Sequence, residues 1–276
     1  MNIAADHHSR GIMHAKTAEQ FYTLTRYLPS PHLSGLVKHY WVVRWDLRGH
    51  APYRQTILSH PNVNLVFERE GARVYGVSPA TSDHLLEDAG WVIGVKFMPG
   101  GFYPFWQAPV SKLTGKSVRM DEALRLEGAS PEGEVYTMGA GEEAVRRVES
   151  ILEEQLAKLP APDGNIKLVS DVVGYIQDDR SVMKVADAAR HAGLHVRTLQ
   201  RLFDRYVGVS PKWVIQRYRL HEALDAAERG AATDWPRLAA ELGYYDQPHF
   251  IRDFKALTGQ SPEEYVRSQS SVPAGI

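Results

Sequence analysis

The chain has 276 residues, of which 43% are hydrophobic and 24% charged, with a formal net charge of −1. This length suits two domains of ordinary size, each with its own core. The sequence contains no cysteine, which excludes disulfide bonds and thiolate zinc sites. No apolar run approaches the roughly 18 residues of a membrane span, and the first residues lack the basic and hydrophobic parts of a secretion signal. We therefore expect a cytoplasmic protein with no membrane partner.

The N-terminal part is predicted to be a β-rich domain that ends in a helix. Its short runs of β-branched and aromatic residues are separated by Pro, Gly and Asn, which is typical of a small barrel or sandwich. The runs cover 36–46, 62–69, 73–77 and 91–97. A helix is predicted from Glu142 to Lys158, because its apolar residues recur on one side. These residues are Val145, Val148, Ile151, Leu152 and Leu156.

The first β run places several large side chains on one face. Strand alternation puts Val37, His39, Trp41, Val43 and Trp45 together, with His39 as the only polar member. We expect His39 and the tryptophans to be core or interface residues, because aromatic side chains chiefly supply buried area. The alternative is a small-molecule pocket lined by His39, Trp41 and Trp45, with His39 as its polar anchor.

A stretch near the C-terminus occurs twice. Phe203–Pro211 (FDRYVGVSP) recurs as Phe254–Pro262 (FKALTGQSP). Each copy ends a helix at a Gly that can adopt the left-handed conformation, and then begins another with Ser as N-cap and Pro in the first turn. A short helix, a Gly-containing turn and a second helix precede each copy, which predicts helix-turn-helix units at 182–206 and 233–257.

The second copy lies within the string LAAELGYYDQPHFIRDFKALTGQSPEEY, residues 238–265. Through this motif, residues from about Lys167 to Arg267 resemble the DNA-binding domain of the AraC/XylS family of bacterial transcription regulators. The resemblance implies that one long helix, Pro211 to about Arg229, joins the two units. One chain then touches two successive major-groove faces, roughly 34 Å apart.

The N-terminal half is similar, more weakly, to the cupin-like sensor domain of some AraC-type regulators. The similarity is carried by segments 27–33, 39–41, 61–67, 76–79 and 95–105. Metal-dependent cupins take their ligands from His-x-His, a following Glu and a later His, and this spacing is missing here. We therefore expect no metal and no other cofactor.

These observations predict an α+β fold. A cupin-like β barrel or sandwich with flanking helices is followed by an all-α domain with two helix-turn-helix units. The expected ranges are 20–158 for a β-rich sensor or dimerisation domain with its C-terminal helix, 159–166 for a linker rich in Pro and Gly, and 167–268 for the DNA-binding domain.

The two units differ in charge. Residues 181–219 contain eight Lys or Arg and two acidic residues, a net charge of +6, whereas residues 220–267 contain five and nine, a net charge of −4. Lys and Arg neutralise DNA phosphates, so we expect the first unit to supply most of the salt dependence of binding.

On the first recognition helix, Arg197, Gln200 and Arg201 share an outward face by their i, i+3, i+4 spacing. They are the expected base contacts, because Arg binds guanine and Gln binds adenine bidentately. The resemblance implies the same positions. Arg205 and Lys212 are expected to contact phosphates, with plain solvent exposure as the alternative.

On the second recognition helix, the expected base contacts are Gln247, Ile251 and Arg252, and the expected phosphate contact is Lys255. The alternative for Arg252 is a salt bridge with Asp253 or Glu241. Asp246 precedes the helix and is expected to be its N-cap.

The predicted function is sequence-specific regulation of transcription through promoter DNA, and not enzyme activity. We expect the N-terminal domain to bind a small-molecule effector, to form a homodimer, or both; the 142–158 helix would either pair between chains or pack on its own β domain. RNA polymerase is a further partner if the protein is an activator. The alternatives are a DNA-tethered enzyme with catalysis in the barrel and an architectural DNA-binding protein without effector control.

Overall fold

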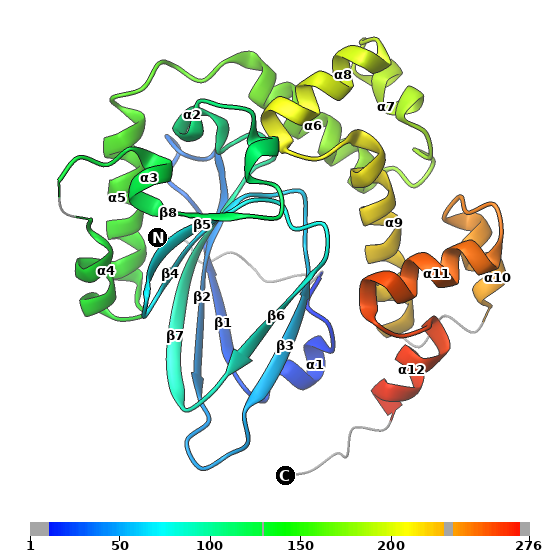
Figure 1. Cartoon of the computed structure of the whole chain (residues 1–276), viewed down its shortest axis with the longest axis horizontal. Coiled ribbons are helices and arrows are strands. Elements are labelled where there is room, and N and C mark those ends of the chain that lie inside the picture. Colours follow the sequence, from blue (N-terminus) through cyan, green and yellow to red (C-terminus); the bar gives the residue numbers. More distant parts are fainter. Residues whose placement is uncertain (1–10, 129, 229–233, 271–276) are drawn as a thin grey trace.

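The computed structural model describes residues 11–128, 130–228 and 234–270. In its N-terminal half, antiparallel strands form a six-stranded sheet in the order β1-β2-β7-β4-β5-β8 and a two-stranded sheet of β3 and β6 (Figure 1). The strands are β1 (Thr23–Tyr27), β2 (Val37–Asp46), β3 (Tyr53–Leu58), β4 (Asn64–Glu68), β5 (Gly71–Tyr75), β6 (Thr81–Leu86), β7 (Ala89–Phe97) and β8 (Ser117–Arg119).

Helices cover one face of the six-stranded sheet. Strands β3 and β6 run apart from this sheet, on the side where α1 lies (Figure 1). The helical elements of this half are α1 (Ala15–Ala18), α2 (Tyr103–Trp106), the 3-10 turn η1 (Val110–Leu113), α3 (Met120–Leu124), α4 (Glu132–Met138) and α5 (Glu142–Leu156). We call the face covered by helices the core face and the opposite one the inner face.

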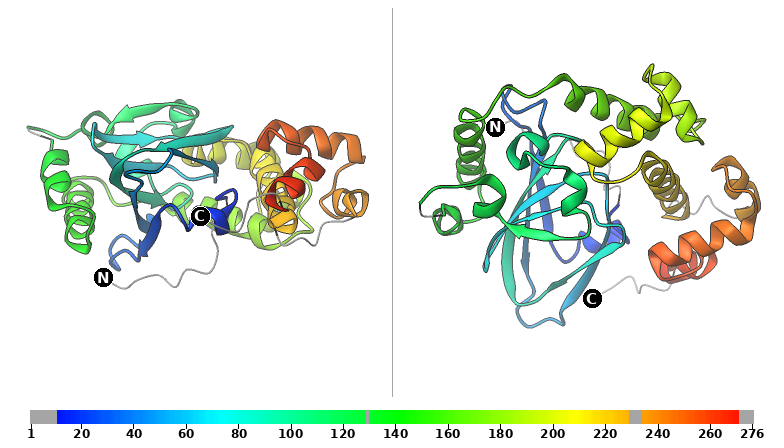
Figure 2. Two further views of the ribbon diagram at one scale, coloured as in Figure 1. Left: turned by 90° about the horizontal axis from the view of Figure 1, so that it is seen from below. Right: turned by 45° about the horizontal axis from the view of Figure 1, so that its top comes forward.

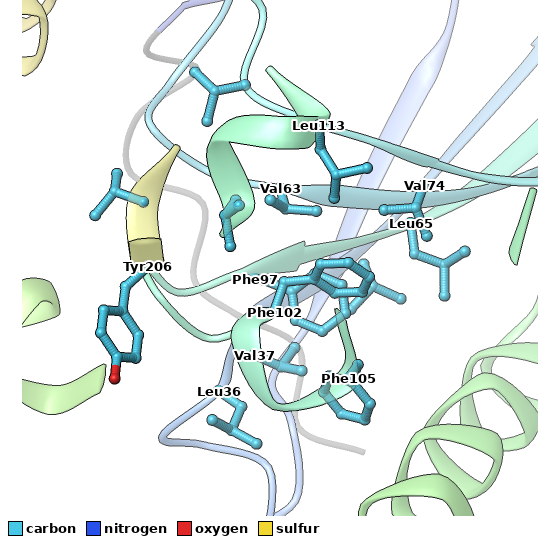
Figure 3. Close-up of a cluster of buried hydrophobic side chains, with 14 of the residues drawn as sticks. Leu36, Val37, Val63, Leu65, Val74, Phe97, Phe102, Phe105, Leu113 and Tyr206 are labelled. Carbon is cyan, nitrogen blue, oxygen red and sulfur yellow. The ribbon is translucent and has the colours of Figure 1, made fainter. Parts of the chain in front are cut away.

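A register shift in β2 decides which of its side chains enter the core. The pairing of β2 with β7 shifts between Val37 and His39, so Val37 joins Tyr40 and Val42 on the core face, where all three are buried. The prediction that Val37 shares a face with His39 is therefore wrong, because strand alternation is interrupted by the irregularity. Figure 3 shows Val37 beside the phenylalanines of the core.

The apolar stripe of α5 packs within its own chain. Val145, Val148 and Leu152 are completely buried, and Ile151 is 3% exposed. The Glu149 carboxylate on the same helix accepts hydrogen bonds from Ser30 N and Tyr40 Oη. Of the two expectations for this helix, packing on the β domain is the one found, since a buried stripe has no surface left to offer a second chain.

The C-terminal half is helical. Its elements are α6 (Gly164–Asp178), α7 (Val185–His191), α8 (Val196–Leu202), the π-helical turn η2 (Phe203–Val207), α9 (Pro211–Glu228), α10 (Trp235–Glu241), α11 (Gln247–Thr258) and α12 (Pro262–Ser270). The chain is thus α+β, as predicted. The predicted linker overlaps the first turn of α6, whose N-cap Asp163 accepts from Asn165 N. Residue 233, the predicted start of the second unit, lies outside the described residues.

The hydrophobic cores do not divide where the sequence suggests. One continuous cluster runs from the β domain through α6 and α8 to Val214, Ile215 and Tyr218 of α9. Tyr206 of η2 lies at its edge, with its hydroxyl pointing away from the cluster (Figure 3). A second cluster holds α10, α11 and α12 against the end of α9, together with Leu58 of β3. The first helical unit is therefore built onto the β domain. The second stands to one side (Figure 2) and touches the N-terminal half through Met13, Leu58 and the stacked rings of His14 and Tyr265.

Candidate nucleic-acid interface

Helices α7 and α8 form the first helix-turn-helix unit. The turn passes through Gly193, whose φ of 65° is in the left-handed region that favours glycine. Leu199 and Phe203 are fully buried beneath α8. At the end of α8 the Gly208 N–H donates to the Phe203 carbonyl, 2.8 Å away, which closes the π-helical turn. This turn directs Tyr206 and Val207 into the core and leaves Arg205 at the surface.

The outward face of α8 carries three polar side chains. Arg197, Gln200 and Arg201 are exposed, as their spacing predicts, and none of their side chains makes a hydrogen bond or ion pair with another described residue. All three line one open cleft of about 640 Å³, together with Asn165 of α6 and Pro109 of the β domain. The structure thus brings the three predicted base contacts together on a solvent-accessible surface.

The two predicted phosphate contacts of this unit differ. Lys212, at the start of α9, is exposed and has no partner among the described residues. Arg205 is held by the β domain: its Nε donates to Tyr103 Oη at 2.8 Å, and its Nη2 donates to the same oxygen. The Arg205 Cζ lies 5.2 Å from the centre of the Tyr103 ring. The Tyr103 phenol thus occupies N–H donors of the Arg205 guanidinium that a phosphate would otherwise accept from.

Helices α10 and α11 form the second unit. Asp246 caps α11 as predicted, since its carboxylate accepts from His249 N at 2.8 Å. Arg252 and Lys255 are exposed and make no side-chain hydrogen bond or salt bridge with a described residue. Lys255 does lie near enough to Glu264 for its charge to help lower the pKa of that carboxyl group. Gln247 and Ile251 are half-buried, and Ile251 packs on the second core cluster.

The alternative partners of Arg252 bind elsewhere. Glu241 accepts from Arg237 Nε at 2.9 Å, and Asp253 lies 3.5 Å from His249 Nε2. The salt bridge suggested for Arg252 is therefore not formed, because both carboxylates pair within their own helices.

Two exposed apolar residues were missed by the sequence reasoning. Tyr245 is 95% exposed in the turn before α11, and Val196 is 38% exposed in the first turn of α8. Both lie at the start of a predicted recognition helix, the end that contacts base edges in helix-turn-helix proteins. An apolar residue next to an N-cap in a predicted turn was the signal available in the sequence.

The connecting helix α9 is buried on most of its surface. Arg217 and Arg219 are only 4% and 2% exposed. The Arg219 Nη2 donates to the Ile176 and Asp179 carbonyls at 2.9 Å each, which satisfies backbone groups at the end of α6. Burial lowers the pKa of Arg217 to about 10. The net charge of +6 assigned to the first unit therefore overstates its surface charge, since two of its eight basic residues do not face solvent.

The β domain contacts α9 along one side. The Arg217 Nη2 donates to the Pro79 carbonyl at 2.6 Å, and His221 Nε2 lies 3.2 Å from the Ser59 carbonyl oxygen. The Thr114 hydroxyl donates to the Gly208 carbonyl, 2.6 Å away, just before α9 begins. Loops at one end of the β domain thus hold both the end of the first recognition helix and the connecting helix.

The three predicted pocket residues lie on the inner face but do not form one group. Trp41 stacks over Gly94 and Trp45 over Gly90, each on the neighbouring strand β7. Trp45 lies near the C-terminal end of β2, where its Nε1 donates to the Glu87 carbonyl. His39 pairs with Lys96 at the opposite end. Burial, followed by the charges of Lys96, Arg26 and Lys38, lowers the pKa of His39 to about 3, so this side chain is neutral at neutral pH.

Comparison with known proteins finds family matches in both halves of the chain. Residues 25–119 match a family described as a domain of unknown function (DUF6597), and residues 188–268 match a family described as a helix-turn-helix domain. Over 228 residues the chain is 25% identical to the arabinose operon regulatory protein of Salmonella typhimurium strain LT2, which covers 76% of each chain.

Solved structures give similarities of low score. An AraC-type DNA-binding domain protein from Chromobacterium violaceum is 20% identical with a TM-score of 0.36, covering 40% of this chain and 98% of that one. ToxT from Vibrio cholerae O395 is 12% identical with a TM-score of 0.38, covering 92% of this chain and 100% of that one.

Among the described residues, no helix is both long and apolar enough to cross a bilayer, and no cluster of three or more His, Asp or Glu side chains is placed to hold a metal ion.

Proposed function

Since the chain belongs to the AraC family of DNA-binding transcription regulators, we propose that it reads promoter DNA with α8 and α11. The observation that carries this proposal is the outward face of α8, where Arg197, Gln200 and Arg201 are exposed, unpaired and adjacent. Arginine and glutamine make the bidentate contacts that distinguish guanine and adenine in the major groove. Arg252, with Gln247 and Ile251 beside it, is the proposed reader on α11.

Three cations are proposed to hold the phosphates: Arg205 and Lys212 of the first unit and Lys255 of the second. Lys212 and Lys255 are exposed and make no hydrogen bond or salt bridge in the described structure. Phosphate contacts fix the position of a protein on the duplex without reading sequence. Arg205 can take this role only after its guanidinium leaves Tyr103.

Replacing Arg201 with alanine tests the proposal. Arg201→Ala should weaken binding to a selected site by about 1–3 kcal/mol and relax the preference at one base pair, because a bidentate guanine contact is lost. Binding sites selected from random duplexes supply the DNA, and anisotropy titrations supply the affinities. Arg190→Ala is the matched control, since Arg190 is also exposed but pairs with Asp187 on α7. Equal losses on selected and random DNA would make Arg201 a phosphate contact.

We propose that the β domain senses a small-molecule effector and does no chemistry on it. The contacts of Tyr103, Thr114 and Pro79 with the helical half support this, because they link the β domain to the DNA-reading elements. A cytoplasmic location, a homodimer formed away from α5, and RNA polymerase as partner of an activator belong to the same proposal. Footprinting separates a regulator, which protects a few sites, from an architectural protein, which covers many.

A further inference from the structure

The inner face of the six-stranded sheet carries a row of polar side chains that runs from β2 to the edge strand β8. They come from five neighbouring strands, and each is directly paired with the next. All five residues are partly exposed, whereas the ammonium group of Lys96 is itself desolvated. We call this set the polar row: His39, Lys96, Asn64, Tyr75 and Ser117.

Lys96 lies at the centre of the charged part of the row, between His39 and Asn64. Its ammonium group makes no hydrogen bond or ion pair with another described residue. Burial, followed by the positive charges of Lys38 and Arg26, lowers the pKa of Lys96 to about 7. The charges of Lys96, Arg26 and Lys38 likewise lower the pKa of His39, and no carboxylate of the described residues opposes them. This region therefore has an excess of positive charge in a desolvated setting.

An apolar surface adjoins the polar row. Trp41 comes two residues after His39 on the same face, and its indole lies directly over Gly94. A Cβ at Gly94 would come within 2.0 Å of the indole Cε2, so only glycine lets the ring lie against the strand. Val66 pairs with Gly94 on the other side. The polar side chains of Lys96 and His39 thus lie next to the apolar surface of Trp41.

We propose that this part of the inner face is the effector site and that it takes a small organic anion, whose carboxylate lies against Lys96, His39 and Asn64 and whose apolar body lies along Trp41. This inference rests on the proposed effector control. Lys96 offers ammonium donors, neutral His39 offers a ring N–H, and Asn64 keeps one amide N–H beyond its 3.4 Å bond to the Asn62 carbonyl. A carboxylate supplies the missing negative charge where low hydration makes pairing strong.

The site is connected to the helix that joins the two DNA-reading units. Next to Lys96, the Phe97 N–H donates to the Val63 carbonyl at 3.0 Å and the Phe97 carbonyl accepts from Asn62 at 2.5 Å. The loop that contains Asn62 begins at Ser59 and His60, which contact His221 of α9. A ligand that moves the end of β7 therefore shifts a loop that touches α9.

Matched acids and amides test the charge requirement on the intact protein. Phenylacetate and hexanoate should bind at least about tenfold more tightly than phenylacetamide and hexanamide, as followed by tryptophan fluorescence and calorimetry. Binding of the acids should take up protons at about pH 8, because a bound anion raises the pKa of Lys96, and calorimetry in two buffers measures this in the wild type. Inorganic phosphate is the third probe: tighter binding of phosphate than of either acid would overturn the assignment to carboxylates.

Lys96→Met should abolish both the preference for the acids and the proton uptake, whereas the exposed-residue control Lys158→Met should retain them. Equal binding of acid and amide by the wild type, no saturable binding of any acid, or an unchanged preference in Lys96→Met would each overturn the inference. DNA binding is measured on the same samples. If the wild type binds DNA specifically but shows no preference for the acids, only this inference is rejected. If the wild type shows no specific DNA binding, the proposed function is rejected.

Discussion

Replacing Tyr103 with phenylalanine should strengthen DNA binding. The change removes the phenol oxygen that accepts from Arg205 at 2.8 Å but keeps the ring beneath the guanidinium. A hydrogen bond to a charged group contributes about 1.5–3 kcal/mol when buried, and exposure of Arg205 reduces this to about 1 kcal/mol. Freeing Arg205 for a phosphate should therefore raise DNA affinity about fivefold and increase the salt slope of log K by about 0.9.

Anisotropy titrations of a labelled selected site at several salt concentrations measure both effects. The control is a double-mutant cycle, in which Tyr103→Phe should change nothing in an Arg205→Ala background, because the released side chain is absent. Circular dichroism checks that both variants are folded. Unchanged or weaker DNA binding by Tyr103→Phe, with an unchanged salt slope, would refute the idea that the β domain and DNA compete for Arg205.

Three further outcomes are expected. Lys212→Ala should lower the salt slope by about 0.9, and an equal or larger drop for Lys255→Ala would contradict the assignment of most phosphate contacts to the first unit. Arg219→Met should lower the free energy of unfolding in urea by about 3–5 kcal/mol, because carbonyls at the end of α6 and Glu222 lose their buried partner, and a loss below about 1 kcal/mol would argue against it. Lys96→Met should stabilise the fold by about 1–3 kcal/mol at about pH 6, because Lys96 is then charged in both states and only the folded state bears its desolvation cost. Urea titration at about pH 9 should find less than half of that gain, since Lys96 of the folded wild type is by then neutral.

The helical half could be predicted closely because its signals are local. The repeat at Phe203 and Phe254, the turn glycines and the cap at Asp246 each fix a short segment by backbone chemistry alone. The outward spacing of Arg197, Gln200 and Arg201 follows from helix geometry and is found in the structure.

The β half was only partly predictable. The strands found from the sequence, β2, β4, β5 and β7, are those rich in Val, Ile and Phe. Strands β3 and β6, with the sequences YRQTIL and TSDHLL, were missed because polar side chains interrupt their alternation. The shift at Val37–His39 depends on pairing with β7, which no local pattern reveals.

The site residues that sequence reasoning missed depend on contacts between distant segments. Lys96 reads as an ordinary surface lysine until strand pairing places it beside His39 and Asn64. Arg217 and Arg219 count as DNA-facing cations until α9 is packed against α6 and the β domain. Burial of a charge is set by tertiary packing, so charge totals along the sequence cannot separate these arginines from Arg201.

The placement of the two cores turns α9 into a lever arm. Its 18 residues span about 27 Å at 1.5 Å per residue. The β domain grips the end that carries the first unit, at Gly208 and Arg217. The far end carries the second unit and meets the N-terminal half at a second point, where His14 N donates to Glu228 Oε1 at 3.0 Å. A tilt of about 5° at the gripped end would displace the far unit by about 2 Å, which is enough to break a base contact whose hydrogen bonds tolerate only a few tenths of an ångström. A small ligand therefore needs to tilt one helix only slightly to change whether a single chain fits two successive grooves.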